Sequence, residues 1–403
     1  MPTVSNIENY ACDFCQSSLS KPDYIPQGTR RLMAVHVCPV CGLSQSCQGV
    51  SEPDRIRTLS ADADWGNVRH GKGVRFGALR SILERDVNWF ETRRAVDIGA
   101  NRGDFILWLN TTHQEVECWA IEPDESVVST YANLSSVRLH VNRLEQVNLT
   151  ASYFDLVLCS HTLEHAESAG GMLETMRQAL KPGGMLLLEV PNLKGITGEE
   201  TVEEFFIDKH SFHFDRETLL DYLRCAGFSV LRGADDTDNL NITLLLRREG
   251  ERVQYRPHDG QDRAARNRQW IADYAKRLPA NRALLKRIVD EKLRPLGKRQ
   301  KVGYWGAGRI FDALVNYGGL EEQDVYCLVD RYLYGIIPKT HGVAIERPEA
   351  LRLREPQVLI ALGRSAEDQI ARTAYAFGVR HVVKFSDLME QARDLPMTHS
   401  DAH

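Results

Sequence analysis

The sequence lacks several features that would place it in a membrane or on nucleic acid. No apolar stretch reaches the roughly 18 residues of a membrane span, and the first residues, MPTVSNIENYACDFC, lack a basic segment followed by an apolar run. Positive charge is not in surplus, because 50 Lys and Arg against 55 Asp and Glu give a formal net charge of −5. Such a chain has no whole-molecule attraction for phosphate backbones. We therefore expect a cytoplasmic protein with neither a membrane nor a nucleic-acid partner.

The remaining composition is that of an ordinary folded protein. Hydrophobic residues make up 43% of the 403 residues and charged residues 26%, which excludes a disordered chain. One hydrophobic core rarely serves so long a chain, so several domains are expected. Patterns along the chain place their boundaries at 1–55, 56–90, 91–248, 249–298, 299–390 and a tail at 391–403.

The first segment, 1–55, contains two CxxC pairs, Cys12 with Cys15 and Cys38 with Cys41. Disulfide frameworks belong mainly to exported proteins, whereas paired cysteines at this spacing are typical of tetrahedral zinc sites. The alternative is four unrelated thiols. We predict a structural Zn²⁺ module, and four protein ligands leave such an ion no open position for catalysis.

The third segment begins with a glycine-rich turn. In RRAVDIGANRGDFILWL an apolar run ends near Asp97, a turn passes through Gly99 and Gly103, and apolar residues then recur at helical spacing. A turn of this kind at the end of a first strand lets a nucleotide-like ligand approach the backbone. The pattern predicts strand, loop and helix.

Further strands follow in a regular βα alternation. CWAIE ends at Glu122, about 20 residues beyond the turn, where a carboxylate can bind both ribose hydroxyls. VRLHVNRLEQV ends its strand near Asn142, which could face an adenine edge or simply be solvated. FDLVLCSHTLEH and LKPGGMLLLEVPN predict a fourth and a fifth strand. The fold class is therefore α/β, with a Rossmann-like sheet.

The motifs VDIGANRGD, AIEPDE, FDLVLCSHTLEH and LKPGGMLLLEVPN, in this order, resemble those of class I S-adenosylmethionine-dependent methyltransferases. The alternative, a nicotinamide-dependent dehydrogenase, expects a GxGxxG triplet that Gly99 and Gly103 do not form. The resemblance implies S-adenosyl-L-methionine as cofactor. It assigns cofactor binding to Asp97, Gly99, Ala100, Asn101, Gly103, Glu122, Pro123, Asn142, Ser160 and His161.

A methyltransferase must also align and deprotonate its acceptor, because the cofactor already carries a good leaving group. The segment FFIDKHSFHFD supplies Lys209, His210 and His213 as candidates. A histidine exchanges protons near neutral pH, so His210 is the leading candidate for the base. The alternative is that it only caps the following helix.

The last third of the chain contains a charged connector and a second α/β pattern. Residues 249–298 predict a solvated helical connector. KVGYWGAGRIFDALV then predicts a strand, a turn through Gly306 and Gly308, and a helix. Phe311 stands where a dinucleotide fingerprint needs its third glycine, so we expect a small Rossmann-like domain over 299–390 without bound NAD.

A zinc module, a methyltransferase core and a C-terminal Rossmann-like domain, in that order, resemble the nucleotide-sugar C-methyltransferases that act on 4-keto-6-deoxy sugars. The resemblance implies that the C-terminal domain helps to hold the nucleotide sugar and that a Glu-His pair supplies the base. His210 falls on that histidine, but Lys209 stands in place of the glutamate, and TDNLNITLLLRR replaces a family segment. Lys209 could instead attract a phosphate or stabilise an enolate or alkoxide, and C- versus O-methylation stays open.

Four further residues are candidates for binding the acceptor. Lys72 and Arg75 lie in DADWGNVRHGKGVRF, within the segment 56–90, which predicts either a strap over an anionic acceptor or a solvated linker. Asn239 and Asn241 could contact the acceptor or serve as turn residues. Two other functions remain as alternatives: a zinc-containing RNA base methyltransferase, and a non-catalytic nucleotide-binding scaffold or sensor.

Overall fold

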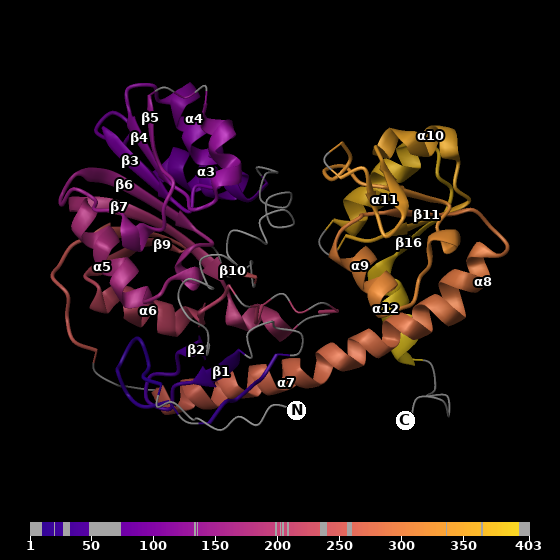
Figure 1. The fold of residues 1–403 in the computed structure, drawn as a ribbon, viewed down its shortest axis with the longest axis horizontal. Coiled ribbons are helices and arrows are strands. Elements are labelled where there is room, and N and C mark those ends of the chain that lie inside the picture. The colour runs from indigo at the N-terminus through magenta and orange to yellow at the C-terminus, as the bar shows by residue number, and fades with distance from the viewer. Residues whose placement is uncertain are drawn as a thin grey trace. The chain divides into compact units, whose positions relative to one another are not determined.

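The computed structural model describes residues 10–19, 21–26, 33–47, 74–132, 134, 136–197, 200–201, 203, 205–207, 209–233, 240–255, 260–335, 337–363 and 366–394. The chain divides into two compact units, each with its own sheet (Figure 1). The first unit comprises Met1–Gly198 and Glu204–Tyr274, and the second comprises Glu199–Glu203 and Ala275–His403.

In the described part of the first unit, the main sheet has seven strands in the order β5-β4-β3-β6-β7-β10-β9. Strands β3 to β7 run parallel, whereas β10 is antiparallel to both β7 and β9. The order reverses between β3 and β6, and ligands of such sheets bind beyond the carboxyl ends of the strands at this point. The strands span Arg94–Ile98 (β3), Glu117–Ile121 (β4), Val137–His140 (β5), Phe154–Ser160 (β6), Leu180–Pro191 (β7), Phe228–Gly233 (β9) and Asn241–Arg248 (β10).

Helices cover both faces of this sheet because its strands are apolar on both sides. Alternate residues of one strand enter different cores: Leu156 and Leu158 of β6 join one, and Val157 and Cys159 join the other. The helices α3 and α4 contribute to the first core, and α5 and α6 to the second. These helices span Val74–Asp86 (α3), Asp104–Thr112 (α4), Ala169–Ala179 (α5) and Arg216–Cys225 (α6).

The N-terminal module belongs to the same unit through a second, three-stranded sheet. This sheet has the order β1-β2-β8, with β1 at Ala34–Val37, β2 at Ser44–Cys47 and β8 at Phe212–His213. Strand β8 follows β7 in the chain and pairs antiparallel with β2, which places Ser44 opposite His213. The N-terminal hairpin thus fixes a segment of the central domain.

The start of helix α7 (Gly260–Arg287) packs against this module through buried polar contacts. Arg263, 5% exposed, donates to the Asp221 carboxylate at 2.9 Å and to the carbonyl of Cys41 at 3.2 Å. The amide of Asn267 donates to the carbonyl of Gly42 at 2.9 Å. Beyond α7 the helical path continues through a π-helical turn, Ile288–Leu293, into α8, Arg294–Gly297, within the segment expected to be helical.

The described part of the second unit contains a six-stranded sheet in the order β13-β14-β12-β11-β15-β16, parallel except for β13. The side chain of Phe311 is fully buried and meets the ring of Tyr304 edge-on, so a bulky group fills the position of the third glycine. The strands span Val302–Trp305 (β11), Cys327–Val329 (β12), Lys339–Thr340 (β13), Val343–Glu346 (β14), Val358–Ala361 (β15) and Val382–Lys384 (β16). The helices span Arg309–Asn316 (α9), Leu351–Arg354 (α10), Glu367–Ala376 (α11) and Phe385–Asp394 (α12).

The predicted fold class, α/β with a Rossmann-like methyltransferase sheet, is confirmed. Within the described ranges, no helix combines the length and the apolar character that crossing a bilayer requires.

Replacing Arg263 by Ala should destabilise the first unit strongly. The substitution removes the buried cation from Asp221 and leaves this carboxylate, among the described residues, only the exposed Arg224, at 2.8 Å. Breaking a buried ion pair typically costs about 3–5 kcal/mol. Urea unfolding followed by circular dichroism measures the change. The control, Arg80→Ala, removes an exposed partner of Glu84 and should cost less than about 1 kcal/mol. Equal losses in the two variants would contradict the role assigned to Arg263.

Candidate active site and metal centre

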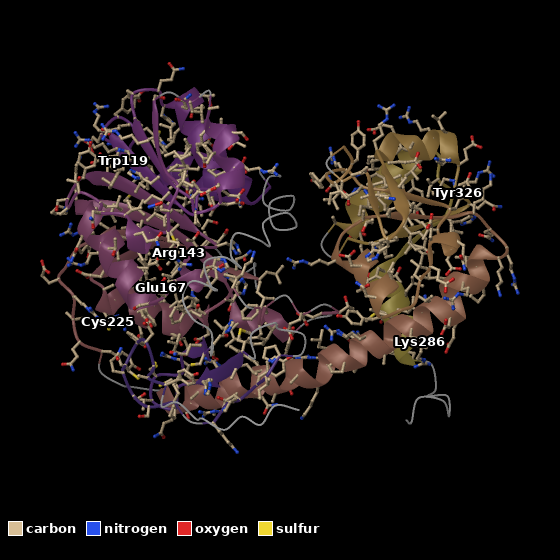
Figure 2. The ribbon with its side chains drawn as sticks, in the orientation of Figure 1. Trp119, Arg143, Glu167, Cys225, Lys286 and Tyr326 are labelled. Carbon is tan, nitrogen blue, oxygen red and sulfur yellow. The ribbon has the colours of Figure 1, made fainter. Side chains whose placement is uncertain are left out.

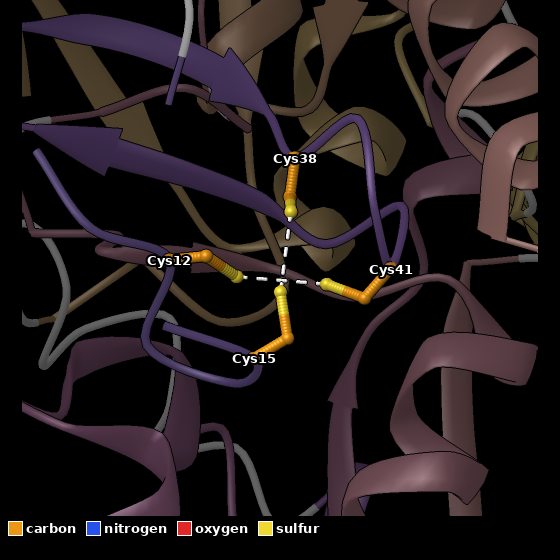
Figure 3. A group of neighbouring side chains, drawn as sticks. All are labelled: Cys12, Cys15, Cys38 and Cys41. Atoms are coloured by element: carbon orange, nitrogen blue, oxygen red, sulfur yellow. Dashed lines mark hydrogen bonds between the residues drawn. The ribbon is translucent and has the colours of Figure 1, made fainter. Parts of the chain in front are cut away.

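The four cysteines of the N-terminal module face one point (Figure 3). The Sγ atoms of Cys12 and Cys41 lie 3.5 Å apart, as do those of Cys15 and Cys38. This separation is far longer than a disulfide of about 2.0 Å and close to the roughly 3.8 Å between sulfurs on a tetrahedral zinc ion with bonds of about 2.3 Å. The backbone N–H of Val40 also donates to Cys38 Sγ at 3.4 Å, as partners of metal-bound thiolates do. The set fits a tetrahedral metal ion.

The glycine-rich turn after β3 adopts a backbone that requires glycine. Gly99 has φ +75°, and a Cβ there would lie 1.9 Å from Thr162 Oγ1. Thr162 follows β6, and its hydroxyl donates to the carbonyl of Ile98 at 3.1 Å. Gly103 has φ +80°, and its Cβ would lie 2.9 Å from the ring of Tyr131. The turns after β3 and β6 therefore meet at the carboxyl edge of the sheet.

Glu122 lies beside this turn with a carboxylate that is largely buried. Its Oε2 accepts from the N–H of Asn101 at 2.8 Å, and its Oε1 accepts from the N–H of Asp124 at 2.9 Å. Burial raises the pKa of Glu122, and these two hydrogen bonds oppose the increase. Each oxygen can accept a second hydrogen bond, so the carboxylate fits the two hydroxyls of a ribose.

Most residues assigned to the cofactor from the sequence lie together around this turn. Asp97 is buried in β3, where burial and the charge of Glu122 raise its pKa well above its usual range. Asn142 is exposed after β5. The group at the carboxyl ends of β3 and β4 consists of Asp97, Gly99, Ala100, Asn101, Gly103, Glu122 and Pro123.

A cluster of histidines surrounds a buried glutamate in the turn after β6. Glu164 is 1% exposed, and its Oε1 lies 3.5 Å from His161 Nδ1 and 3.8 Å from His165 Nε2. Burial alone would raise the pKa of Glu164, but the neighbouring His165, His161 and His210 lower it to about 2. The rings of His165 and His210 lie 5.0 Å apart, centroid to centroid. The fold thus brings His210 to an acidic partner from another segment.

The two central histidines are held by backbone carbonyls. His210 Nδ1 lies 2.7 Å from the carbonyl oxygen of Phe205, and His165 Nδ1 lies 2.9 Å from that of Lys209. A carbonyl only accepts, so each Nδ1 carries the proton and each Nε2 carries a lone pair when the ring is neutral. Burial and the nearby His165 lower the pKa of His210 to about 4, and burial lowers that of His165. Both rings are therefore neutral at pH 7.

Ser160 and His161 contact a second buried glutamate. Glu189, at the end of β7, accepts from the Ser160 hydroxyl at 2.9 Å and from the Thr243 hydroxyl at 2.9 Å. His161 Nε2 lies 3.3 Å from the same Glu189 Oε1. His161 also has φ +50°, a conformation that is uncommon for a residue other than glycine and that often occurs at functional sites. His161 thus lies between Glu164 and Glu189.

Arg143, labelled in Figure 2, supports the same turn from the end of β5. Its guanidinium donates to the carbonyl of His165 at 3.1 Å and to Glu145 at 3.2 Å, and it lies 3.7 Å from Glu167. The arginine is largely buried. Its contacts therefore hold the backbone on which Glu164 and His165 lie.

The other catalytic and substrate candidates lie in different surroundings. His213 is 1% exposed, its Nε2 lies 2.7 Å from Ser46 Oγ, and its ring packs on Phe206, which favours a structural role. Lys209 is half-buried. Asn241 begins β10 opposite Pro191. Outside the described residues and side chains lie Lys72, Arg75 and Asn239.

Three residues that the fold places here have no role predicted from the sequence: Glu164, His165 and Glu189. A signal for each was present. HTLEH puts Glu164 and His165 directly after an apolar strand, and Glu189 interrupts the apolar run LLLEVP. An acidic residue in a strand that is otherwise buried is rarely tolerated without a partner, and so indicates a site.

Comparison with known proteins agrees with this geometry. Residues 74–232 match the family model described as "Methyltransferase domain". Over these residues the chain is similar to a methyltransferase domain. A tRNA U34 carboxymethyltransferase of Desulforapulum autotrophicum is 26% identical to the chain over 154 residues, which are 36% of this chain and 44% of that protein. The chain thus spans less than half the length of this curated relative.

Solved structures also resemble part of this chain distantly. A 1,6-didemethyltoxoflavin-N1-methyltransferase of Burkholderia thailandensis matches 57% of this chain and 100% of its own at 16% identity and a TM-score of 0.40. An S-adenosylmethionine-dependent methyltransferase of Mesorhizobium loti matches 43% of this chain and 96% of its own at 17% identity and a TM-score of 0.36. Scores this low support no conclusion about substrate.

Replacing Cys38 by Ser should abolish zinc binding by the N-terminal module. A hydroxyl is a much poorer zinc ligand than a thiolate, so the set would lose one of its four donors. Atomic absorption after dialysis measures zinc per chain, and we expect one ion fewer per chain in the variant than in the wild type. Cys225→Ser, in a cysteine outside the cluster, should retain the ion. Equal zinc contents in wild type and Cys38→Ser would remove the four cysteines from metal binding.

Proposed function

We propose that this chain transfers a methyl group from S-adenosyl-L-methionine to a nucleotide-linked sugar or a related glycan precursor, at carbon or oxygen. One observation carries the proposal. The turn after β6 contacts Gly99 through Thr162 and, two residues later, supplies Glu164 to the cluster around His210. A cofactor held at the glycine turn would therefore have acid–base groups beside it.

The cofactor side follows from the residues around Gly99. Glu122 would bind the ribose hydroxyls, and the turn from Gly99 to Gly103 would leave room for the methionine and ribose parts. S-adenosylmethionine supplies an activated methyl group on a sulfonium, so the protein need only position it and bring the acceptor into line. The four cysteines would bind a structural zinc ion.

The acceptor side rests on His210. Its Nε2 carries the lone pair that can take a proton from a hydroxyl or from a carbon beside a ketone. Glu164, ionised and buried, would stabilise the imidazolium that forms, as a carboxylate does in other His-based sites. Glu164 can therefore serve in place of the glutamate of the Glu-His pair, whose position is occupied by Lys209 in this chain.

A nucleotide-sugar acceptor is favoured by the order of the three parts of the chain and by the net charge of −5, which gives little attraction for a nucleic acid. The second candidate is an RNA base, because the curated relative is named for a reaction on tRNA U34.

The acceptor class can be tested directly with labelled cofactor. Purified protein is incubated with methyl-labelled S-adenosylmethionine and, separately, with nucleotide sugars, tRNA and small phenols. We expect label in a nucleotide sugar. His210→Gln should lower kcat at least about 100-fold, the usual contribution of a general base, with cofactor affinity unchanged. The control, His113→Gln, changes a histidine at the end of α4 and should leave turnover intact. Label in tRNA alone would refute the sugar acceptor.

Replacing Glu122 by Gln should weaken cofactor binding. Charge-assisted hydrogen bonds contribute about 1.5–3 kcal/mol, so the Kd for S-adenosylmethionine should rise about 10- to 100-fold in isothermal titration calorimetry. Glu125→Gln removes a nearby exposed carboxylate and should leave the Kd unchanged. If both variants bind as the wild type does, the ribose does not contact Glu122.

A further inference from the structure

A second group of potential metal ligands lies in the first unit, apart from the four cysteines. In the described ranges, donor atoms of Glu164, His165 and His210 lie within 4.8 Å of one another. Two of these residues come from the turn after β6, and the third precedes β8. The fold, and not a sequence motif, brings the three together.

The two imidazoles are arranged as metal ligands are. The Nδ1 atoms of His165 and His210 each contact a backbone carbonyl, that of Lys209 at 2.9 Å and that of Phe205 at 2.7 Å. Metal-binding histidines almost always donate one ring N–H to a carbonyl or carboxylate, because this fixes the tautomer and aims the other nitrogen. In both rings Nε2 is therefore the ligand atom.

The glutamate supplies the negative charge that such a site needs. Glu164 is 1% exposed, and among the described residues neither of its carboxylate oxygens has a hydrogen-bond partner. The nearest imidazole nitrogens, of His161 and His165, lie 3.5 and 3.8 Å from Oε1, beyond the roughly 3.2 Å of a good N–H···O bond. Ligands with bonds of about 2.1 Å to one ion lie roughly 3 to 4 Å apart. The 3.8 Å between Glu164 and His165 thus suits a shared cation better than a direct hydrogen bond.

We propose that Glu164, His165 and His210 bind one divalent first-row transition-metal ion. Two imidazoles and one carboxylate suit Mn²⁺, Fe²⁺, Co²⁺ or Zn²⁺, whereas Mg²⁺ prefers oxygen ligands alone. Three protein ligands leave positions open for an oxygen of the acceptor. This site differs from the four-cysteine set, which would enclose its ion completely.

The metal site itself stands apart from the proposed function, but its part in catalysis rests on that function. At the step of proton removal the bound ion replaces His210 in the role of base. A hydroxyl bound to the ion, or the carbon beside a ketone bound to it, becomes more acidic, so the acceptor can lose its proton to a water molecule and leave an alkoxide or enolate for the methyl group. With the ion bound, His210 Nε2 is a ligand and does not take the proton itself. The general-base mechanism and the metal mechanism therefore differ in whether His210 Nε2 accepts a proton or binds the ion.

Manganese binding to protein that contains one zinc ion per chain tests the site. The four thiolates retain zinc in preference to Mn²⁺, whereas imidazole and carboxylate ligands accept Mn²⁺. Electron paramagnetic resonance counts free Mn²⁺ during a titration with the metal alone. We expect one saturable site per chain, with affinity reduced at least tenfold in Glu164→Gln and His210→Gln and unchanged in His113→Gln. Zinc content is measured in the same samples.

No saturable binding by the wild type, or equal binding by all four proteins, would overturn the site. If a ligand variant fails to fold, the Tm of the wild type tests the site instead. Mn²⁺ that binds the folded state must raise this Tm as its concentration increases. A constant Tm would overturn the inference. Binding without methyl transfer would refute the proposed function and leave the site. Methyl transfer in a protein that binds no Mn²⁺ would refute the metal site and leave the proposed function.

Discussion

The pairing of β8 with the N-terminal hairpin is the constraint on which the candidate active site depends. The N–H of Ser46 donates to the carbonyl of Ser211 at 2.8 Å, and the N–H of Ser211 donates to the carbonyl of Glu164 at 2.7 Å. The segment that carries His210 is thus joined on one side to the cysteine module and on the other to the turn after β6. A module that resembles a separate zinc domain in the sequence thereby positions the central histidine.

The turn after β6 connects the two halves of the site. Thr162 leaves no space for a side chain at Gly99, and Glu164 two residues later lies among the histidines. Arg143, which follows β5 in the chain, donates to the carbonyl of His165. One short segment therefore positions the groups proposed for the cofactor and for the acceptor. It lies at the point where the strand order reverses, where open α/β sheets bind their ligands.

Local spacing made part of this site predictable. Three features are recognisable from the spacing of a few residues: the two CxxC pairs, the turn from Gly99 to Gly103, and Glu122 at the end of the next strand. The fold class follows from the βα alternation. The partner of His210 is not local. The family resemblance places an acidic partner at position 209, where this chain has Lys209. The fold instead brings Glu164, from the turn after β6, close to His210. Nor does the pattern around His210 show that His213 is buried against Ser46, because burial depends on the N-terminal hairpin.

The central claim is that the cofactor and the histidine cluster share the carboxyl edge of one sheet. A crystal structure of the protein with bound S-adenosylhomocysteine tests it most directly. The account predicts the ribose hydroxyls on the Glu122 carboxylate and the cofactor sulfur on the side of Glu164 and His210. A sulfur that faces away from these residues, or a ribose held elsewhere, would contradict it.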